Sequence, residues 1–318
     1  MITFPNNLHQ EILHLKKQRN AVILAHFYQD AEIQDIADFV GDSLDLSRKA
    51  STTDADEIIF CGVKFMAEVA KILSPQKKVL IPDHKAGCSL EDSCKPTDFE
   101  KFRALHPDAI AITYINCSAE IKALSDIIVT STNAQKIISQ IPTHQKIIFA
   151  PDQHLGRFIA KQTQRDMILW HGSCIVHEQF SEKELVKLIA NHSQALVIAH
   201  PECPQDLLKY AHHVGSTSSL LNFVGNNPAR EFIVLTEPHI IHQMRKINPQ
   251  AKFYDCPFIN TTGCSACNNC PYMGLNNLEK LYEVLKLENK SRFGGELQLD
   301  EALRIKAEKP LRKMLEMS

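Results

Sequence analysis

Cysteine is the residue type with the most specific chemistry in this chain of 318 residues, which contains ten of them. Three lie in the run CSACNNCP, at Cys264, Cys267 and Cys270, while Cys88 lies in KAGCSL and Cys174 in HGSCIVHEQF. A C-x2-C-x2-C run before proline indicates iron–sulfur or zinc ligation, because thiolates a few residues apart can share one metal. One thiolate from each part of the chain could meet at a common centre.

Two other interpretations of the cysteines stay open at this point. The run lacks the fourth cysteine of a full ferredoxin motif, so Cys256, Cys264, Cys267 and Cys270 could instead form a structural zinc knuckle. The remaining cysteines, taken singly, are best explained as small buried apolar side chains. They are Cys61, Cys94, Cys117 and Cys203. We expect no disulfide framework, because thiols stay reduced in a long chain without an export signal.

Polar or titratable side chains recur just beyond three apolar runs of the sequence. They are His26, Tyr28, Tyr114, Asn116, His200 and Glu202. Hydroxyl groups recur in a similar way where a helical pattern begins, a position that suits carboxylate or phosphate ligands. They are Ser43, Ser131, Ser216 and Thr217. A single serine there is usually only an N-cap, but recurrence in three places predicts one shared site if the three parts of the chain pack around a common axis.

Three similar units must position these groups. Apolar strands are predicted at Ala21–His26, Ala109–Tyr114 and Ala195–His200, and their starts lie 88 and 86 residues apart. Further strands, each leading into a helical pattern, are predicted from Glu57, Asp126 and His212, and the runs that close the units begin at Lys78, Lys146 and Glu231. Alternating strands and helices predict parallel sheets with helices on both faces.

The predicted fold is therefore α/β, with three similar three-layer α/β/α domains. We assign residues 1–95 to the first domain with Cys88, 96–180 to the second with Cys174, 181–290 to the third with Cys270, and 291–318 to a tail that packs on the domains. The first unit is expected to carry an extra segment, residues 33–50, between its first two strands. One large doubly wound sheet is the alternative.

Composition excludes several classes of protein. The 35 basic and 37 acidic residues give a formal charge of -2, which argues against electrostatic capture of nucleic acid. The longest apolar runs are too short to cross a bilayer, and the N-terminus has no basic start followed by an apolar core. We therefore expect a cytoplasmic protein with neither a membrane span nor a signal peptide.

The chain resembles the quinolinate synthase family over nearly its whole length. The resemblance rests on ordered strings that surround the residues named above, namely AHFYQ, DFVGDSL, FCGVKFMAEVAKIL, GCSL, TYINCSAEIKALSD, TSTNA, FAPDQHLG, WHGSCIVHEQF, AHPEC, GST and CSACNNCPYM. It implies three α/β domains around a pseudo-threefold axis, with a [4Fe-4S] cluster where they meet. It also implies the condensation of iminoaspartate with dihydroxyacetone phosphate to quinolinate, phosphate and water, in NAD biosynthesis.

The resemblance also implies roles for individual residues. The cluster ligands correspond to Cys88, Cys174 and Cys270, which leaves Cys264 and Cys267 as a pair able to form a redox-sensitive disulfide. Substrate contacts fall on His26, Ser43, Tyr114, Asn116, Ser131, His200, Glu202 and Thr217. Tyr28, Tyr114, His200 and Glu202 are the candidates for proton transfer, and Lys64 is a further candidate for binding anions. An enzyme that oxidises aspartate is the expected source of iminoaspartate.

Three thiolates on four irons would leave one iron open as a Lewis acid, and an exposed iron implies sensitivity to oxygen. Two other classes of function stay in competition. An electron-transfer module would normally fill all four cluster positions with protein ligands. A zinc-dependent lyase or hydrolase would be colourless and would use His200 and Glu202 as metal ligands.

Overall fold

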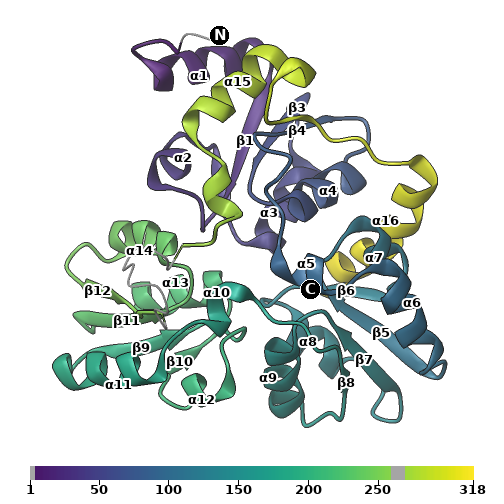
Figure 1. Ribbon diagram of the computed structural model, residues 1–318, viewed down its shortest axis with the longest axis vertical. Coiled ribbons are helices and arrows are strands. Elements are labelled where there is room, and N and C mark those ends of the chain that lie inside the picture. The colour runs from purple at the N-terminus through teal and green to yellow at the C-terminus, as the bar shows by residue number, and fades with distance from the viewer. Residues whose placement is uncertain (1–3, 259–268) are drawn as a thin grey trace.

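The computed structural model describes residues 4–258 and 269–318, and it contains three separate parallel sheets. Figure 1 shows them in three lobes, the first at the top and the second and third side by side below it. The chain is thus an α/β protein built from several sheets, and the alternative of one large doubly wound sheet is wrong.

The first sheet has the strand order β13-β4-β3-β1-β2. Its strands are β1 (Ala21–His26), β2 (Phe39–Gly41), β3 (Glu57–Cys61), β4 (Lys78–Ile81) and the late antiparallel edge strand β13 (Gly295–Glu296). The central strands are buried from end to end, as is typical of parallel strands covered by helices on both faces.

The second and third sheets repeat the order of the parallel strands of the first. The second sheet has the order β6-β5-β7-β8, with β5 (Ala109–Tyr114), β6 (Ile127–Val129), β7 (Lys146–Ala150) and β8 (Ile168–Leu169). The third has the order β10-β9-β11-β12, with β9 (Leu196–Ala199), β10 (His213–Val214), β11 (Glu231–Leu235) and β12 (Lys252–Asp255). In each unit the first strand therefore lies between the second and the third strands.

This shared order corrects one detail of the sequence analysis. Residues 33–50 are not an extra segment, because they contain β2, which pairs with β1 as β6 pairs with β5. The strand that begins at Glu57 is the third strand of its unit and corresponds to β7 and β11. A strand of three residues is too short to show a period in the sequence. Ser43, directly after β2, is consequently equivalent in position to the hydroxyls after β6 and β10.

Helices connect the strands and cover both faces of the sheets. In the first unit they are α1 (Leu8–Gln18), α2 (Ala31–Ile36), α3 (Ser43–Thr52), α4 (Lys64–Leu73) and α5 (Ser89–Ser93). In the second they are α6 (Pro96–Ala104), α7 (Ala119–Ala123), α8 (Ala134–Ser139), α9 (Gln153–Thr163) and α10 (Ile175–Glu178). In the third they are α11 (Glu182–Asn191), α12 (Gln205–Leu208), α13 (Thr217–Asn226), η1 (Pro238–Ile240) and α14 (Ile241–Ile247).

The C-terminal part of the chain returns to the first and second sheets. It contains η2 (Met273–Leu275), α15 (Leu278–Leu287), η3 (Glu288–Lys290), β13 and α16 (Glu301–Met317). Apolar residues of α15 pack with Ile12, Ile23 and Ile59 of the first unit, although the predicted boundary at residue 290 groups α15 with the third. Helix α16 joins a core cluster that spans the first and second units. The C-terminal part of the chain therefore packs on the first sheet.

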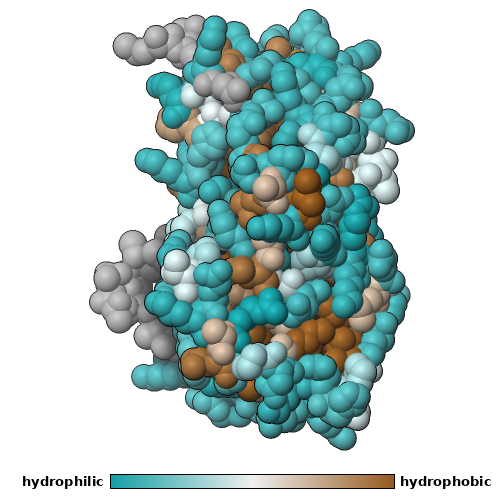
Figure 2. All heavy atoms as spheres, turned by 90° about the vertical axis from the view of Figure 1, so that its right-hand side faces the viewer, coloured by the Kyte–Doolittle hydropathy of each residue, from teal (hydrophilic) through white to brown (hydrophobic). Residues whose placement is uncertain are grey.

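Within the described residues, no helix combines the length and apolarity that a bilayer span needs. Figure 2 shows a mostly hydrophilic face on which apolar side chains emerge in several areas. The large apolar side chains that are exposed come from unrelated elements, among them Leu13, Leu105, Val186, Ile247 and Ile305. The apolar surface of the described residues is therefore distributed over the molecule.

Candidate active site

A cavity of about 650 Å³ is lined by residues of all three units. Twelve of the side chains singled out from the sequence lie in its wall, whereas Ser216 and Lys64 do not. The twelve are His26, Tyr28, Ser43, Cys88, Tyr114, Asn116, Ser131, Cys174, His200, Glu202, Thr217 and Cys270. The expectation that polar strand ends would gather around one centre therefore agrees with the observed wall.

The ends of the first strands supply the titratable part of the wall. Tyr114 ends β5 and donates a 2.6 Å hydrogen bond to Oε1 of Glu202, which follows β9. His26 ends β1, and its ring lies edge-on to Tyr28 with the ring centroids 4.6 Å apart. Oδ1 of Asn116 is buried and has no hydrogen-bond partner among the described residues. A buried acceptor without a partner is costly unless a ligand donates to it.

The ends of the second strands supply the hydroxyl groups. Ser43 begins α3 and Thr217 begins α13, and both helices are ten residues long. Ser131 lies 3.3 Å from Nε2 of His200, measured from its Oγ. The positive dipole end of a helix favours bound anions. At α3 the Asp42 carboxylate already accepts the first N–H groups, whereas α13 is capped by the neutral hydroxyl of Ser216. This side of the cavity is therefore suited to carboxylate or phosphate groups.

Each unit also contributes one cysteine, placed just before a short helical turn. Cys88 is the N-cap residue of α5, Cys174 is the N-cap residue of α10, and Cys270 lies shortly before η2. Backbone N–H groups of the following residues lie near each sulfur and lower its pKa, but neither Cys88 nor Cys174 forms a side-chain cap hydrogen bond. The first two cysteines follow the fourth strands of their units. The three sulfur atoms thus have similar local surroundings in three different units.

Burial governs the protonation of these three thiols. It raises the pKa of Cys88 and Cys174 well above the ordinary value and that of Cys270 to about 11. Neighbouring thiols raise these pKa values further, because Cys270 lies near Cys88 and Cys88 lies near Cys174. Without a metal all three are neutral thiols. A bound cation would displace their protons, because only the thiolate is a strong metal ligand.

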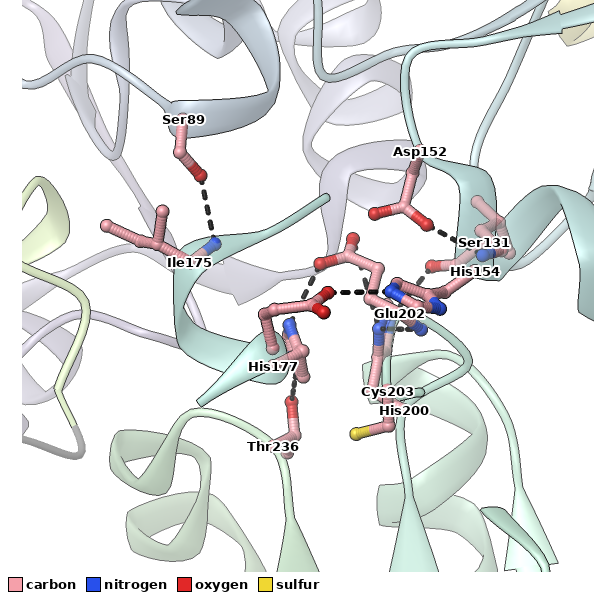
Figure 3. A network of polar contacts seen from close by, with 12 residues as sticks. Ser89, Ser131, Asp152, His154, Ile175, His177, His200, Glu202, Cys203 and Thr236 are labelled. Atoms are coloured by element: carbon pink, nitrogen blue, oxygen red, sulfur yellow. Dashed lines mark hydrogen bonds and ion pairs between the residues drawn. The ribbon is translucent and has the colours of Figure 1, made fainter. Parts of the chain in front are cut away.

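Several residues of the site were missed by the sequence analysis. Nδ1 of His177 lies 2.9 Å from Oε2 of Glu202, and its Nε2 lies 2.9 Å from Oγ1 of Thr236 (Figure 3). Oγ1 of Thr236 is in turn 2.6 Å from the hydroxyl of Tyr28. With the Tyr114 bond, these contacts link two cavity tyrosines through His177 and Glu202. The only local signal was a histidine three residues after Cys174.

Electrostatics distinguish the acid from the imidazoles in this chain of contacts. Burial opposes ionisation of Glu202, but His200 and His177, with the hydrogen bond from Tyr114, hold its pKa well below the ordinary value. Burial lowers the pKa of both His26 and His200 to about 4. Burial also raises the pKa of Tyr28 and Tyr114, with Glu202 adding to it. At neutral pH Glu202 is therefore a carboxylate, while the imidazoles of His26 and His200 and the phenols of Tyr28 and Tyr114 are neutral.

Other acidic residues of the site also escaped the sequence analysis. Asp42 lines the cavity and caps α3, and Glu237 lines it and accepts a 3.2 Å hydrogen bond from the backbone N–H of Cys270. Lys64 begins α4 and pairs with Glu68 across 3.8 Å, but it does not line the cavity. Cys264 and Cys267, and with them the predicted disulfide, lie outside the described residues.

The remaining cysteines agree with the prediction of apolar packing. They are Cys61, Cys94, Cys117 and Cys203, all at most 1% exposed. A different group of potential metal ligands is formed by Cys174, His177 and Glu202, whose ligand atoms lie within 4.8 Å of one another. The cavity therefore offers a set of three thiols and a mixed set that shares one of them. Identification of the bound metal would show which of the two ligand sets is used.

Comparison with known proteins places these features in a family. A family model described as "Quinolinate synthetase A protein" matches residues 10–316. A protein of Trichodesmium erythraeum named quinolinate synthase is 57% identical over 316 residues, which cover 99% of this chain and 95% of the other. Proteins of the same name from Ehrlichia chaffeensis and Synechocystis are 59% and 56% identical, each covering 97% of the relative and 97% and 99% of this chain.

Proposed function

The chain belongs to the quinolinate synthase family, and on that premise we propose that its three-unit cavity condenses iminoaspartate with dihydroxyacetone phosphate. The products are quinolinate, phosphate and water, and the role is in NAD biosynthesis. The observation that carries the proposal is the convergence of one cysteine from each unit on a cavity that also holds helix N-termini and the Tyr114–Glu202 pair.

The residues present fit a [4Fe-4S] cluster held by Cys88, Cys174 and Cys270. Each sulfur lines the same cavity, each comes from a different unit, and backbone N–H groups that lie nearby favour the thiolate. A cluster with three protein ligands supplies an open iron that acts as a Lewis acid toward an oxygen of the substrate. Placement of the ligands on three units would bind the units together around it.

The opposite side of the cavity binds the charged ends of the substrates. Both substrates are anions, and the chain carries a net charge of -2, so local groups must offset their charge. The N-terminus of α13 with Thr217, the hydroxyl of Ser43, and the neutral imidazoles of His26 and His200 are the groups available. The free acceptor of Asn116 suits a donor group of the substrate. Held between this side and the thiols, the two substrates are oriented for condensation.

Proton transfer is assigned to Glu202 and the contacts that converge on it. The distances accommodate donation from Tyr28 to Thr236 and from Thr236 to Nε2 of His177. The last step would run from Nδ1 of His177, which lies 2.9 Å from Oε2 of Glu202 but forms no hydrogen bond to it in this arrangement. The oxygen of Tyr28 can then accept a proton from substrate while its own proton moves toward Glu202. Tyr114 provides a second, direct path to the same carboxylate. Aromatising the ring and isomerising the triose phosphate both require such transfers.

The larger organisation follows from the repeat. We propose that the units 1–95, 96–180 and 181–290 are domains related by a pseudo-threefold axis through the cavity, with residues 291–318 as a tail across them. The support is the common strand order and the equivalent positions of Ser43, Ser131 and Thr217. An enzyme that oxidises aspartate would supply iminoaspartate.

The test is anaerobic purification followed by iron and sulfide analysis, a visible spectrum and an assay for quinolinate. We expect a brown protein with about four irons per chain, which is the composition of the cluster. Cys88→Ser, Cys174→Ser and Cys270→Ser should each lose iron and activity, while Cys203→Ser, a change at a cysteine of the core, should retain both. A colourless zinc protein, or iron retained in all three variants, would overturn the assignment.

A further inference from the structure

Asp42 connects all three units on one side of the cavity. It is 4% exposed, and its Oδ1 accepts the backbone N–H groups of Leu44 and Asp45 at the start of α3. Its Oδ2 accepts 2.6 Å and 2.9 Å hydrogen bonds from Thr132 of the second unit and Ser218 of the third. One carboxylate therefore holds the three second-strand ends together.

A groove of about 1220 Å³ runs outside this contact, between the second and third units. Its wall includes Thr132, Ser216 and Ser218, and it shares Ser131 with the inner cavity. Only a thin layer of side chains at residues 131–132 and 216–218 therefore separates the groove from the site. This layer is fastened by hydroxyl hydrogen bonds to Asp42 and by the contact of Ser131 with His200, and the Ser218 hydroxyl also lies 3.1 Å from Oδ2 of Asp45.

A pocket that adjoins the groove carries positive charge. This pocket shares Phe158 with the groove and is lined by Arg157 and Lys161 of α9. Both cations are exposed, and neither forms an ion pair within the described part of the chain; Arg157 bonds only to the amide of Gln153. Free cations beside a groove attract anionic ligands toward it.

We propose that Asp42 is a positioning residue that fastens the wall between the groove and the cavity, and that the anionic substrates reach the site through this groove. Release of the Thr132 and Ser218 hydroxyls from Asp42 opens the wall, and their return closes the cavity around bound substrate. Closure of this kind excludes water and completes the site. The inference rests on the proposed function for the identity of the substrates, but the wall itself can be examined without them.

The test uses the holoenzyme of the double variant Thr132→Val, Ser218→Ala, which keeps Asp42 and its cap on α3. Hydrogen exchange of residues 129–135 and 214–220 should become faster, with unchanged iron content. KM for dihydroxyacetone phosphate should rise about tenfold or more with a smaller change in kcat, because each lost bond to a charged acceptor weakens the closed state by about that factor. Thr132→Ser, which retains the hydroxyl, should behave like the parent protein.

Ser219→Ala is the matched control, because the Ser219 hydroxyl lies on the same helix but bonds to His213 within its own unit, at 2.9 Å. Exchange and KM within twofold of the parent in the double variant would overturn the proposal. So would a Thr132→Ser variant as impaired as Thr132→Val, since the effect would then follow shape and not the hydroxyl. If the parent protein makes no quinolinate, the proposed function fails, and the exchange measurement still decides whether Asp42 fastens the wall.

Discussion

Tyr114 and Glu202 join the second and third units across the cavity through a 2.6 Å hydrogen bond from the phenol to the carboxylate. Replacement of Tyr114 by Phe removes this donor from a buried carboxylate and cuts one proton path. We expect kcat for quinolinate formation to fall by about 100-fold or more, the usual contribution of a positioned acid or base. Iron content should be unchanged, because Tyr114 touches no proposed ligand.

Tyr210→Phe is a matched control for this change. Tyr210 also donates to a glutamate, Glu182, at 2.9 Å, but this pair lies on the surface of the third unit. Its loss should leave kcat within twofold of the parent. An unaltered kcat in Tyr114→Phe would remove the Tyr114–Glu202 pair from the chemistry and leave it a structural contact between two units.

Thr236 tests the longer path from Tyr28 to Glu202. Thr236→Val keeps the shape of the side chain but breaks the two contacts of 2.6 Å and 2.9 Å that link Tyr28 to His177. We expect kcat to fall by about tenfold to 100-fold and the solvent deuterium isotope effect on kcat to change, whereas Thr236→Ser should preserve both. Equal losses in the valine and serine variants would indicate a packing defect and count against proton transfer through Thr236.

The sequence reveals those parts of the site that lie at the ends of regular strands. The predicted strands Ala21–His26 and Ala109–Tyr114 match β1 and β5 residue for residue, and β9 falls within the third predicted strand. Because ligands bind beyond the carboxyl ends of parallel strands, His26, Tyr114 and His200 can each be predicted from the sequence as site residues of their own unit. That they line one cavity depends on how the three sheets pack. The strands that end at or just before these residues are buried runs of β-branched and aliphatic residues, a pattern that predicts a strand clearly.

The parts that the sequence did not reveal depend on short elements or on tertiary packing. β2 has three residues, so no period identifies it, and the role of Asp42 at its end went unnoticed. Thr236 and His177 meet only because a loop after β11 approaches α10, a contact between positions 59 residues apart in the chain. Helix α15 has an ordinary amphipathic sequence, and nothing local indicates that it packs on the first sheet.

The contacts of His239 predict that the stability of the folded protein depends on pH. Its ring lies 2.8 Å from Asp30 of the first unit and 2.7 Å from Glu237 of the third, and hydrogen bonds to Asp30 and Glu237 raise its pKa from 6.5 to about 10. A histidine whose pKa is raised on folding stabilises the fold fully below pH 6.5, and this contribution is lost as the pH rises toward 10. We expect the thermal midpoint to decrease across this interval and the His239→Gln variant to show a flatter profile. An identical slope in both proteins would contradict the prediction.

Charge at the groove provides the last prediction. Arg157 and Lys161 are exposed cations on α9 beside the groove that leads toward Ser131. If anionic substrates approach there, the double variant Arg157→Glu, Lys161→Glu should lower kcat/KM by about tenfold at low ionic strength, with little change in kcat, and salt should reduce the difference. Lys306→Glu, Lys309→Glu on α16 makes the same change in net charge on exposed residues that line neither the groove nor the adjoining pocket, and it should have a much smaller effect. Equal effects of the two double variants would mean that overall charge, and not this groove, governs the approach of substrate.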